Sequence, residues 1–305
     1  MTKQRDFKRR VRARMALTGE SYAVARLRLG NERDAWTAVH DLQPTAAGRE
    51  VEVAIIKLNQ QSARIRLLDD GRDVTLRCPT WHELIPGQIA TVRLSREWSF
   101  KGYGYASGAV LGVRTDVPAL GLTPLPLEDC GEQDFSSFEP YVEGEPYADL
   151  WFWATARPRP SFEFNAIAWD AVAATTGDCE QTPVADAAEL GELGEVDVAR
   201  AMLMDVLAVD LRCIDAHAHL GNQLFEGSAS RALVHYEIGK DIAELSLGPD
   251  FAGALLWGHV NNRPYLRCLH GYGLCLWRLG RAVEAERVFR RMFWLNPNDN
   301  QGARS

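Results

Sequence analysis

The sequence contains no apolar run approaching the roughly 20 residues that a membrane-spanning helix needs. No apolar core follows the basic N-terminus, so we expect no secretion signal there. The six cysteines are scattered, without a C-x-x-C pair, which favours reduced thiols in a cytoplasmic protein over a disulfide scaffold. Lysine is scarce beside arginine, which we interpret as the codon bias of a GC-rich bacterial genome.

The sequence also lacks a P-loop and a nucleophile elbow, and Lys101-Gly-Tyr-Gly is too short for a dinucleotide fingerprint. One string, Ile214 to Leu220, resembles the H-x-H metal motif of amidohydrolases. That fold needs roughly 200 further residues of alternating strands and helices, whereas the remaining chain has helical periodicity. On a helix, His217 and His219 point roughly 200° apart and cannot share one metal ion. We therefore predict no catalytic residues, no metal and no cofactor.

What the sequence does contain is an uneven distribution of charge. With 305 residues, 46% of them hydrophobic and 25% charged, the chain has the composition of an ordinary globular protein of about two domains. Its net charge is −7. Residues 1–30 carry nine Lys and Arg against Asp6 and Glu20, a net of +7, so residues 31–305 sum to −14. A basic arm on an acidic body indicates a polyanion or an acidic partner for the arm.

The basic arm, residues 1–48, has a helical pattern with one interruption. Phe7, Val11 and Met15 follow helical spacing, which resumes after a break at Thr18-Gly19. Two short helices around such a turn resemble a helix-turn-helix, or the helical half of a ribbon-helix-helix DNA-binding protein. Contacts with nucleic-acid phosphates would then come from the basic side chains Lys8, Arg9, Arg12 and Arg14. Two alternatives stay open: a solvated helix face, or docking of the arm onto the protein's own acidic segment.

Residues 49–114 have the alternating pattern of β-strands. Val51, Val53 and Ile55 alternate with polar or small residues, and the same period recurs from Ala63 to Leu67. Asp69-Asp70-Gly71 is a hairpin signal, and further strands are expected at 74–78, 89–94 and 109–113. About five short strands predict a small antiparallel barrel of the size of an OB or SH3-like unit.

An aromatic stretch before the last predicted strand has two interpretations. Small barrels often bind single-stranded nucleic acid through aromatic and basic side chains. The side chains that would serve here are Trp98, Phe100, Lys101, Tyr103 and Tyr105. We favour the other interpretation, in which the aromatics form the core of the barrel or its contact with the next domain, because no sequence-specific motif accompanies them.

Residues 115–180 have the composition of a connecting segment, in which several prolines break regular structure. The segment is acidic, and no Lys or Arg precedes Arg157. Its aromatic residues argue against disorder, so we expect it to wrap over another surface of the protein.

From residue 181 to the end, the periodicity is helical and a pattern repeats. Leu193-Gly194 and Ala199 recur as Leu279-Gly280 and Ala285 at identical spacing. The stretch from Leu266 to Asp299 is similar to a tetratricopeptide (TPR) repeat, whose period is about 34 residues. We expect about two and a half repeats.

Two features disturb the predicted repeats. Pro183 shortens or removes the first helix of the first unit, and Leu247 to Pro264 is a long insertion before the last unit.

The TPR resemblance implies a concave surface, lined by the first helix of each pair, on which a peptide or a partner helix lies. The groove residues that it implies are Asn222, Phe225, Arg267, His270, Trp277 and Arg278. Asn222 and Arg267 fall where some TPR domains hold a peptide carboxylate. The resemblance therefore implies a protein or peptide partner.

The predicted repeats end without a final covering helix. Phe289 and Phe293 are left on an apolar edge, and a patch of that kind needs cover. We expect cover from the aromatic segment around Phe135–Trp153, or from a second copy of the chain in a homodimer through this edge.

The sequence therefore predicts an α+β protein with four parts. These are a basic helical arm (1–48), a small β-barrel (49–114), an acidic connecting segment (115–180) and a TPR-type helical domain (181–305). The function we favour is non-catalytic protein–protein interaction through the helical surface. The alternative is a nucleic-acid-associated regulator that binds through the arm and the barrel. Neither function involves a membrane.

Overall fold

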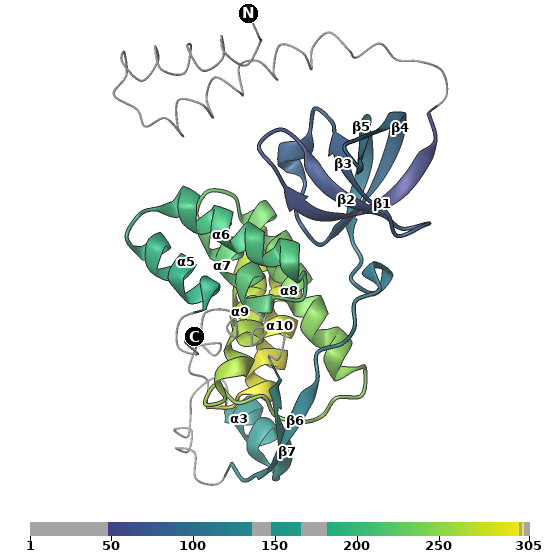
Figure 1. Ribbon diagram of the computed structural model, residues 1–305. Helices are drawn as coiled ribbons and strands as arrows, with labels where there is room; N and C mark the ends of the chain where they lie inside the picture. The colour runs from purple at the N-terminus through teal and green to yellow at the C-terminus, as the bar shows by residue number, and fades with distance from the viewer. Residues whose placement is uncertain (1–47, 136–147, 166–181, 299–300, 302–305) are drawn as a thin grey trace, which may run out of the picture. The chain divides into compact units, whose positions relative to one another are not determined.

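Five strands between Glu50 and Thr115 form a closed barrel in the computed structural model of this protein (Figure 1). The structure describes residues 48–135, 148–165, 182–298 and 301. The predicted arm, with Lys8, Arg9, Arg12 and Arg14, thus lies outside the described residues. The strands are β1 (Glu50–Leu58), β2 (Ala63–Leu67), β3 (Asp73–Arg77), β4 (Gln88–Phe100) and β5 (Tyr103–Thr115).

The strand order around the barrel is β1-β2-β3-β5-β4, with β4 back beside β1. Neighbouring strands are antiparallel except β3 and β5, which run parallel. The prediction of a wholly antiparallel barrel is therefore wrong, and parity gives the reason. Strands of alternating direction close into a ring only when their number is even, so a closed barrel of five strands needs one parallel pair.

Part of β1 is buried on both faces. Val53 and Ile55 lie in the core of the barrel, whereas Ala54 and Ile56 pack in a cluster with Leu203 of α6 (Val196–Val209). The residues from Arg49 to Ser305 form one compact unit. The outer surface of β1 is consequently covered by helices at Ala54 and Ile56, whereas Glu50 and Glu52 at its start are exposed.

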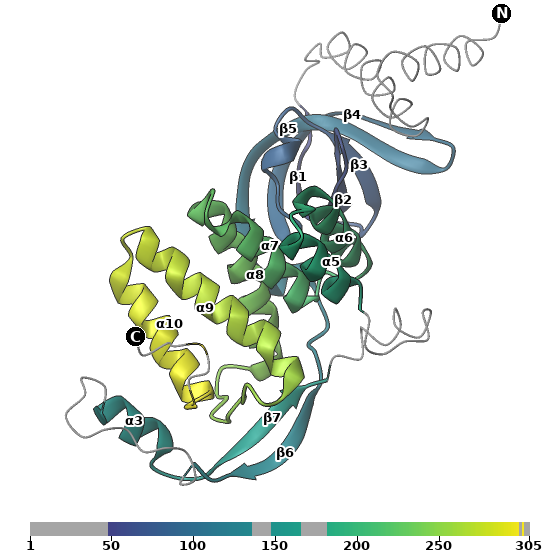
Figure 2. The same cartoon turned by 90° about the vertical axis from the view of Figure 1, so that its left-hand side faces the viewer.

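Helices make up the described chain after residue 182, and they pack as three hairpins (Figure 2). Besides α6, they are α5 (Pro183–Glu192), α7 (Ile214–Phe225), α8 (Ala229–Leu247), α9 (Arg263–Arg278) and α10 (Ala282–Leu295). Gly194 and Gly280, with φ of 86° and 77°, form the turns of the first and third pairs, which is where the repeated Leu-Gly pattern predicts them. That these pairs are TPR repeats stays a prediction.

Pro183 begins α5 instead of removing it. Thr182 accepts a hydrogen bond from the backbone N–H of Ala185 at 3.2 Å and caps the helix, and proline is well suited to the first helical position. α5 has 10 residues, against 12 in α7 and 16 in α9. The prediction of a shortened first helix is confirmed.

Glycines allow aromatic rings to lie between the helices. Tyr236 of α8 lies between Gly221 of α7 and Gly271 of α9: a Cβ added at Gly271 would lie 2.3 Å from the ring Cζ, and one at Gly221 would lie 2.5 Å from Cε1. A Cβ at Gly273 would similarly lie 2.7 Å from Cε1 of Phe289 in α10. The rings occupy the space that larger side chains would need.

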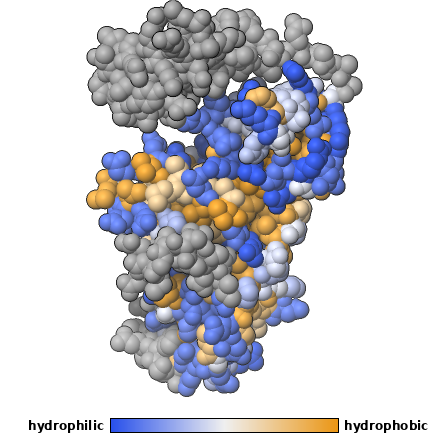
Figure 3. Space-filling view, viewed as in Figure 1, coloured by the Kyte–Doolittle hydropathy of each residue, from blue (hydrophilic) through white to orange (hydrophobic). Residues whose placement is uncertain are grey.

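Exposed apolar side chains gather on the first helix pair. Figure 3 shows hydrophobic surface over α5 and α6, whereas the barrel surface in this view is mostly hydrophilic. Leu193 and Val209 are 72% and 76% exposed. Apolar surface of this kind suits contact with another protein.

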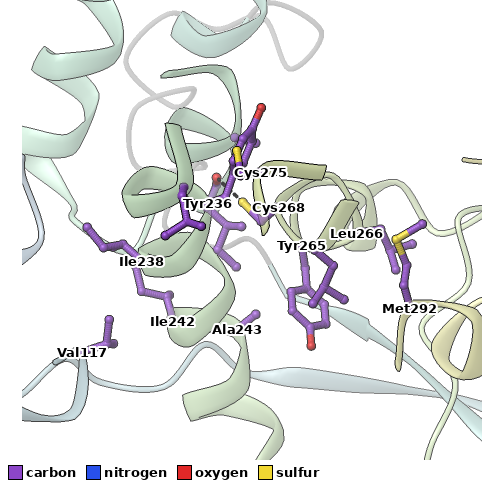
Figure 4. Packing of buried hydrophobic residues seen from close by; sticks show 14 of the residues in the cluster. Val117, Tyr236, Ile238, Ile242, Ala243, Tyr265, Leu266, Cys268, Cys275 and Met292 are labelled. Carbon is purple, nitrogen blue, oxygen red and sulfur yellow. Dashed lines mark hydrogen bonds between the residues drawn. The ribbon is translucent and has the colours of Figure 1, made fainter. Parts of the chain in front are cut away.

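The largest cluster of buried side chains joins the second and third helix pairs. Figure 4 shows Ile238 and Ile242 of α8 near Val117, which follows β5, and Leu266 of α9 beside Met292 of α10. The segment after the barrel therefore contributes to the core of the helical pairs.

The predicted connecting segment contains regular structure as well as irregular chain. β6 (Leu127–Gln133) and β7 (Arg159–Phe164) form an antiparallel ribbon, and α3 (Ala148–Thr155) precedes β7. The insertion after α8 lies along this ribbon, since the backbone of Ala254 bonds to Pro160 and Phe162 at 2.8 and 2.9 Å. For residues 127–133 and 148–164, the expectation that the segment packs over another surface of the protein is confirmed.

α3 covers the end of α10. Phe293 is only 2% exposed, and it packs with Trp151 at 6.2 Å between ring centroids. Trp153 lies 4.4 Å from the ring of Trp294. The predicted cover by the aromatic segment is confirmed, while a homodimer through this edge stays a prediction.

Arg159 of β7 joins α3 to α10. Its Nη2 donates to the carbonyl oxygens of Ala154 and Trp294 at 3.1 and 2.8 Å, and its guanidinium lies 3.8 Å from the centroid of the Trp294 ring. Burial, followed by the charges of Arg157 and Arg291, lowers the pKa of Arg159 to about 10. The group therefore remains charged at neutral pH.

Candidate functional site

Four of the predicted groove residues line one pocket of about 440 Å³ between the second and third helix pairs. They are Asn222, Phe225, Arg267 and His270. Trp257, from the insertion, and Gln301, near the C-terminus, add further walls. Trp257 and Gln301 thus help to form the pocket beside the predicted groove residues.

The polar groups of this pocket already have partners. Arg267 Nη1 donates to Asp215 Oδ1 at 2.8 Å, and its guanidinium lies 5.8 Å from the Trp257 ring centroid. Asn222 Oδ1 accepts a hydrogen bond from the hydroxyl of Tyr236 at 2.6 Å. A peptide carboxylate would have to compete with Asp215 for Arg267, which weakens the case for a carboxylate clamp.

The other two predicted groove residues do not line the pocket. Trp277 is 65% exposed. Arg278 lies 4.2 Å from the centroid of the Phe225 ring and donates to the Phe225 carbonyl at 2.9 Å and to Glu226 at 3.0 Å. Arg278 therefore does not line the pocket itself but contacts two residues that do, Phe225 and Glu226.

His217 and His219 both lie on α7, as predicted. His217 is fully buried, with its Nδ1 3.4 Å from Nδ1 of His235. Burial lowers the pKa of His217 to about 4, so it is neutral at pH 7. His219 instead lies beside Asp215, with 3.7 Å between Nε2 and Oδ1. The two histidines have separate neighbours and do not form a shared metal site.

The aromatic stretch of the barrel forms the end of the hairpin between β4 and β5. Lys101 and Gly102, with φ of 51° and 82°, are the two turn residues, and positive φ at both is typical of a type I′ turn. Phe100 and Tyr103 are 58% and 71% exposed. Trp98 and Tyr105 are half-buried, but Phe100 and Tyr103 do not lie in the barrel core, so our favoured interpretation of the aromatics as core residues is wrong for these two. The reason is that the turn extends both strands to 13 residues and carries the rings away from the core.

Strand register places aromatic and basic side chains on one outer face. Tyr105 pairs with Thr75 on one side and Trp98 on the other, and the Trp98 and Tyr105 rings stack with centroids 5.7 Å apart. In the next row, Ser107 pairs with Arg77 and Arg96. Ala106, between Tyr105 and Ser107, is buried in the barrel core, so its two neighbours point outward. We call this surface of β3, β5 and β4 the hairpin face.

The cations of the hairpin face differ from those elsewhere on the barrel. The guanidinium groups of Arg77 and Arg96 lie 5.8 and 5.5 Å from the Trp98 ring centroid, and Lys101 lies 5.4 Å from that of Phe100. Within the described ranges, none of these three pairs with a carboxylate. Arg93, by contrast, pairs with Glu50 at 2.6 Å.

β2 adds two further arginines beside the hairpin face. Arg64 and Arg66 share a single carboxylate, that of Asp73, at 3.1 and 2.8 Å. The hairpin face and its border therefore carry excess positive charge, although residues 31–305 as a whole are acidic.

Sequence reasoning named the aromatics of this face but missed Arg77 and Arg96. Arg96 could have been found from strand alternation, because it lies two residues before Trp98 on the same strand and therefore on the same face. Arg77 reaches this face through the parallel pairing of β3 with β5, for which the sequence has no local signal.

Comparisons of the chain with protein-family models, with curated proteins and with solved structures found no match. In the part of the chain that the structure describes, no helix is both long enough and apolar enough to cross a membrane.

Proposed function

We propose that this protein binds single-stranded nucleic acid on the hairpin face of its barrel. The observation that carries the proposal is the set of exposed and half-buried rings beside cations that pair with no carboxylate among the residues the structure describes. Phe100 and Tyr103 offer open ring faces, on which bases stack regardless of sequence. Arg77, Arg96 and Lys101 lie within 6 Å of the neighbouring rings, where they can meet the phosphates of a stacked strand.

The strand order supports the same proposal by analogy. A five-stranded closed barrel with a parallel contact between β3 and β5 resembles the OB type more than the SH3 type. OB barrels bind oligonucleotides and oligosaccharides with strands 2 and 3 and with the loops after strands 1 and 4. The turn after β4 is the Lys101-Gly102 turn. Folds host many functions, so the residues of the hairpin face, and not the strand order, are the main support.

The negative charge of the rest of the chain should restrict nucleic acid to the hairpin face. A polyanion is repelled by a body with a net charge of −14 and attracted by the local excess of arginine. Because β1 packs against α6 at Ala54 and Ile56, the nucleic-acid strand is expected to approach from the side of β3, β5 and β4.

The test is binding of labelled oligothymidylate and oligouridylate by fluorescence anisotropy over a range of salt concentrations. Removing an exposed ring in Tyr103→Ala should cost about 1–3 kcal/mol, the usual contribution of one stacked base. Arg77→Ala and Arg96→Ala should each reduce the slope of log affinity against log salt by about 0.7. The matched control is Arg93→Ala, which removes an exposed barrel arginine that already has a carboxylate partner.

A variant with Ala at Lys8, Arg9, Arg12 and Arg14 separates the contribution of the arm. If that variant abolishes binding while Tyr103→Ala and Arg77→Ala have no effect, the hairpin face is not the site. Equal losses in Arg93→Ala and Arg77→Ala would likewise contradict the proposal, because binding would then depend only on total charge.

A second candidate function is binding of a protein partner by the helical pairs. The observation in its favour is the apolar surface of the first pair, where Leu193 and Val209 are exposed, together with the pocket at Asn222 and Arg267. Calorimetry with a peptide that ends in acidic residues tests the pocket. Arg267→Ala and Arg278→Ala should weaken that peptide, whereas unchanged affinity removes the carboxylate hypothesis.

A further inference from the structure

A cysteine, a glutamate and a histidine meet where the insertion lies against the β6–β7 ribbon. One ligand atom from each of Cys130, Glu163 and His259 lies within 4.8 Å of the other two. The three residues come from β6, β7 and the segment before α9, so the chain brings them together only on folding. From these positions we infer a zinc site held by Cys130, Glu163 and His259, with a fourth position open to water.

Distances between the ligand atoms fit a site that tightens around an ion. Zinc bonds of about 2.0–2.3 Å in tetrahedral geometry place neighbouring ligand atoms about 3.3–3.8 Å apart. His259 Nδ1 and Glu163 Oε2 are already 3.6 Å apart. The remaining approach, by the Cys130 sulfur, requires about 1.5 Å of movement at most on that geometry, which rotation of an exposed side chain can supply.

The ribbon has a local structure that presents Cys130. The pairing of β6 with β7 shifts register between Asp129 and Glu132, which leaves Cys130 and Gly131 in a bulge, with φ of 84° at Gly131. Ser161 of β7 donates its hydroxyl to the Gly131 carbonyl at 3.0 Å and holds the bulge. Bulges commonly re-aim a side chain next to a functional site.

A hydrogen bond from the backbone fixes the orientation of the Glu163 carboxylate. Its Oε1 accepts a hydrogen bond from the backbone N–H of Asn261 at 3.0 Å, which leaves Oε2 directed to His259. An outer partner of this kind fixes the orientation of a ligating carboxylate. Glu163 and His259 are 23% and 30% exposed at the side chain, so an ion can reach them from solvent.

The surroundings favour a divalent cation of borderline softness. Glu128 and Asp129 lie in β6 next to Cys130, and their charge adds to that of Glu163. Thiolate and imidazole ligands select zinc over magnesium or calcium, which prefer oxygen alone. A bound ion would join the insertion to the ribbon, and the insertion supplies Trp257 to the helical pocket.

The test uses Co²⁺ as a spectroscopic substitute for Zn²⁺ in the full-length protein after removal of metal with a chelator. The expected result is one equivalent of Co²⁺ with a thiolate-to-metal charge-transfer band and the intense visible bands of a tetrahedral site, both displaced by Zn²⁺. Cys130→Ser should abolish the charge-transfer band. Glu163→Gln and His259→Gln should weaken Zn²⁺ binding at least tenfold, by analogy with the loss caused by outer-shell changes alone.

Two control variants make the result specific. His82→Gln removes an exposed histidine that lies 3.8 Å from Glu83 without a neighbouring thiol in the described ranges, and it should bind metal as the unaltered protein does. Cys179→Ser removes a cysteine outside those ranges and should keep the charge-transfer band. Absence of the band in the unaltered protein, its persistence in Cys130→Ser, or its loss in Cys179→Ser would each overturn the zinc site. None of these outcomes bears on nucleic-acid binding.

Discussion

Replacement of Gly271 by alanine is predicted to destabilise the protein, although alanine is the better helix former. In a helix interior the change from glycine to alanine should gain about 1 kcal/mol. At Gly271, however, the new Cβ would lie 2.3 Å from Tyr236 Cζ. The ring cannot move away, because its other side packs directly against the backbone of Gly221.

The size of the effect follows from these contacts. Overpacking of a close-packed core costs about 1–3 kcal/mol, and we expect the upper end because the ring is held on both sides. Displacing the Tyr236 hydroxyl from Asn222, 2.6 Å away, costs about 1 kcal/mol more. Against the helical gain, the net loss is about 2–3 kcal/mol, which corresponds to a fall in Tm of roughly 4–12 °C for a unit of this size.

The assay is thermal and urea unfolding of Gly271→Ala beside Gly191→Ala in α5. No atom lies within 4 Å of a Cβ at Gly191, so that variant should be more stable by about 0.5–1 kcal/mol. In a Tyr236→Leu background, Gly271→Ala should cost little or nothing, since the ring is gone. A Gly271→Ala protein that unfolds at or above the Tm of the unaltered protein would refute the reasoning.

Two further predictions concern the buried histidines and the covering helix. Because the pKa of His217 falls from 6.5 to about 4 on folding, the unfolded chain takes up the proton first. Stability should therefore decrease by about 2 kcal/mol as the pH falls from 7 to 5, and His217→Leu should reduce that slope in urea titrations at each pH. Trp151→Ala should cost about 3 kcal/mol and expose Phe293, which increased binding of a hydrophobic dye would report; unchanged dye binding would show that α3 does not provide the cover.

The sequence was sufficient to predict elements whose signals are local. Asp69-Asp70-Gly71 joins β2 to β3 as expected, with φ of 72° at Gly71. The repeated Leu-Gly pattern predicts the turns at Gly194 and Gly280. Periodicity and turn residues depend on neighbours within a few positions, so they can be read without knowledge of the rest of the chain.

Other features depend on pairing between distant residues and could not be predicted. The parallel contact of β3 with β5 follows from closure of the barrel, which no local signal encodes. The contacts of Arg267 with Asp215 and of Arg77 with the Trp98 ring likewise join residues that are far apart in the sequence. Helical register placed both Arg267 and Asp215 in the groove but gave no sign that they form an ion pair across 52 positions of sequence. The parallel pairing of β3 with β5 brought Arg77 to the Trp98 ring, beside which Arg96 of β4 also lies.

Arg159 has a consequence for the order of assembly. Its Nη2 reaches carbonyl oxygens near the C-terminal ends of two helices, α3 and α10. The negative ends of two helix dipoles thus partly balance a buried cation. One of those ends lies 135 positions further along the chain. The balance is incomplete until α10 has formed, so α3 should dock late in folding and should be the first helix released when the end of α10 frays.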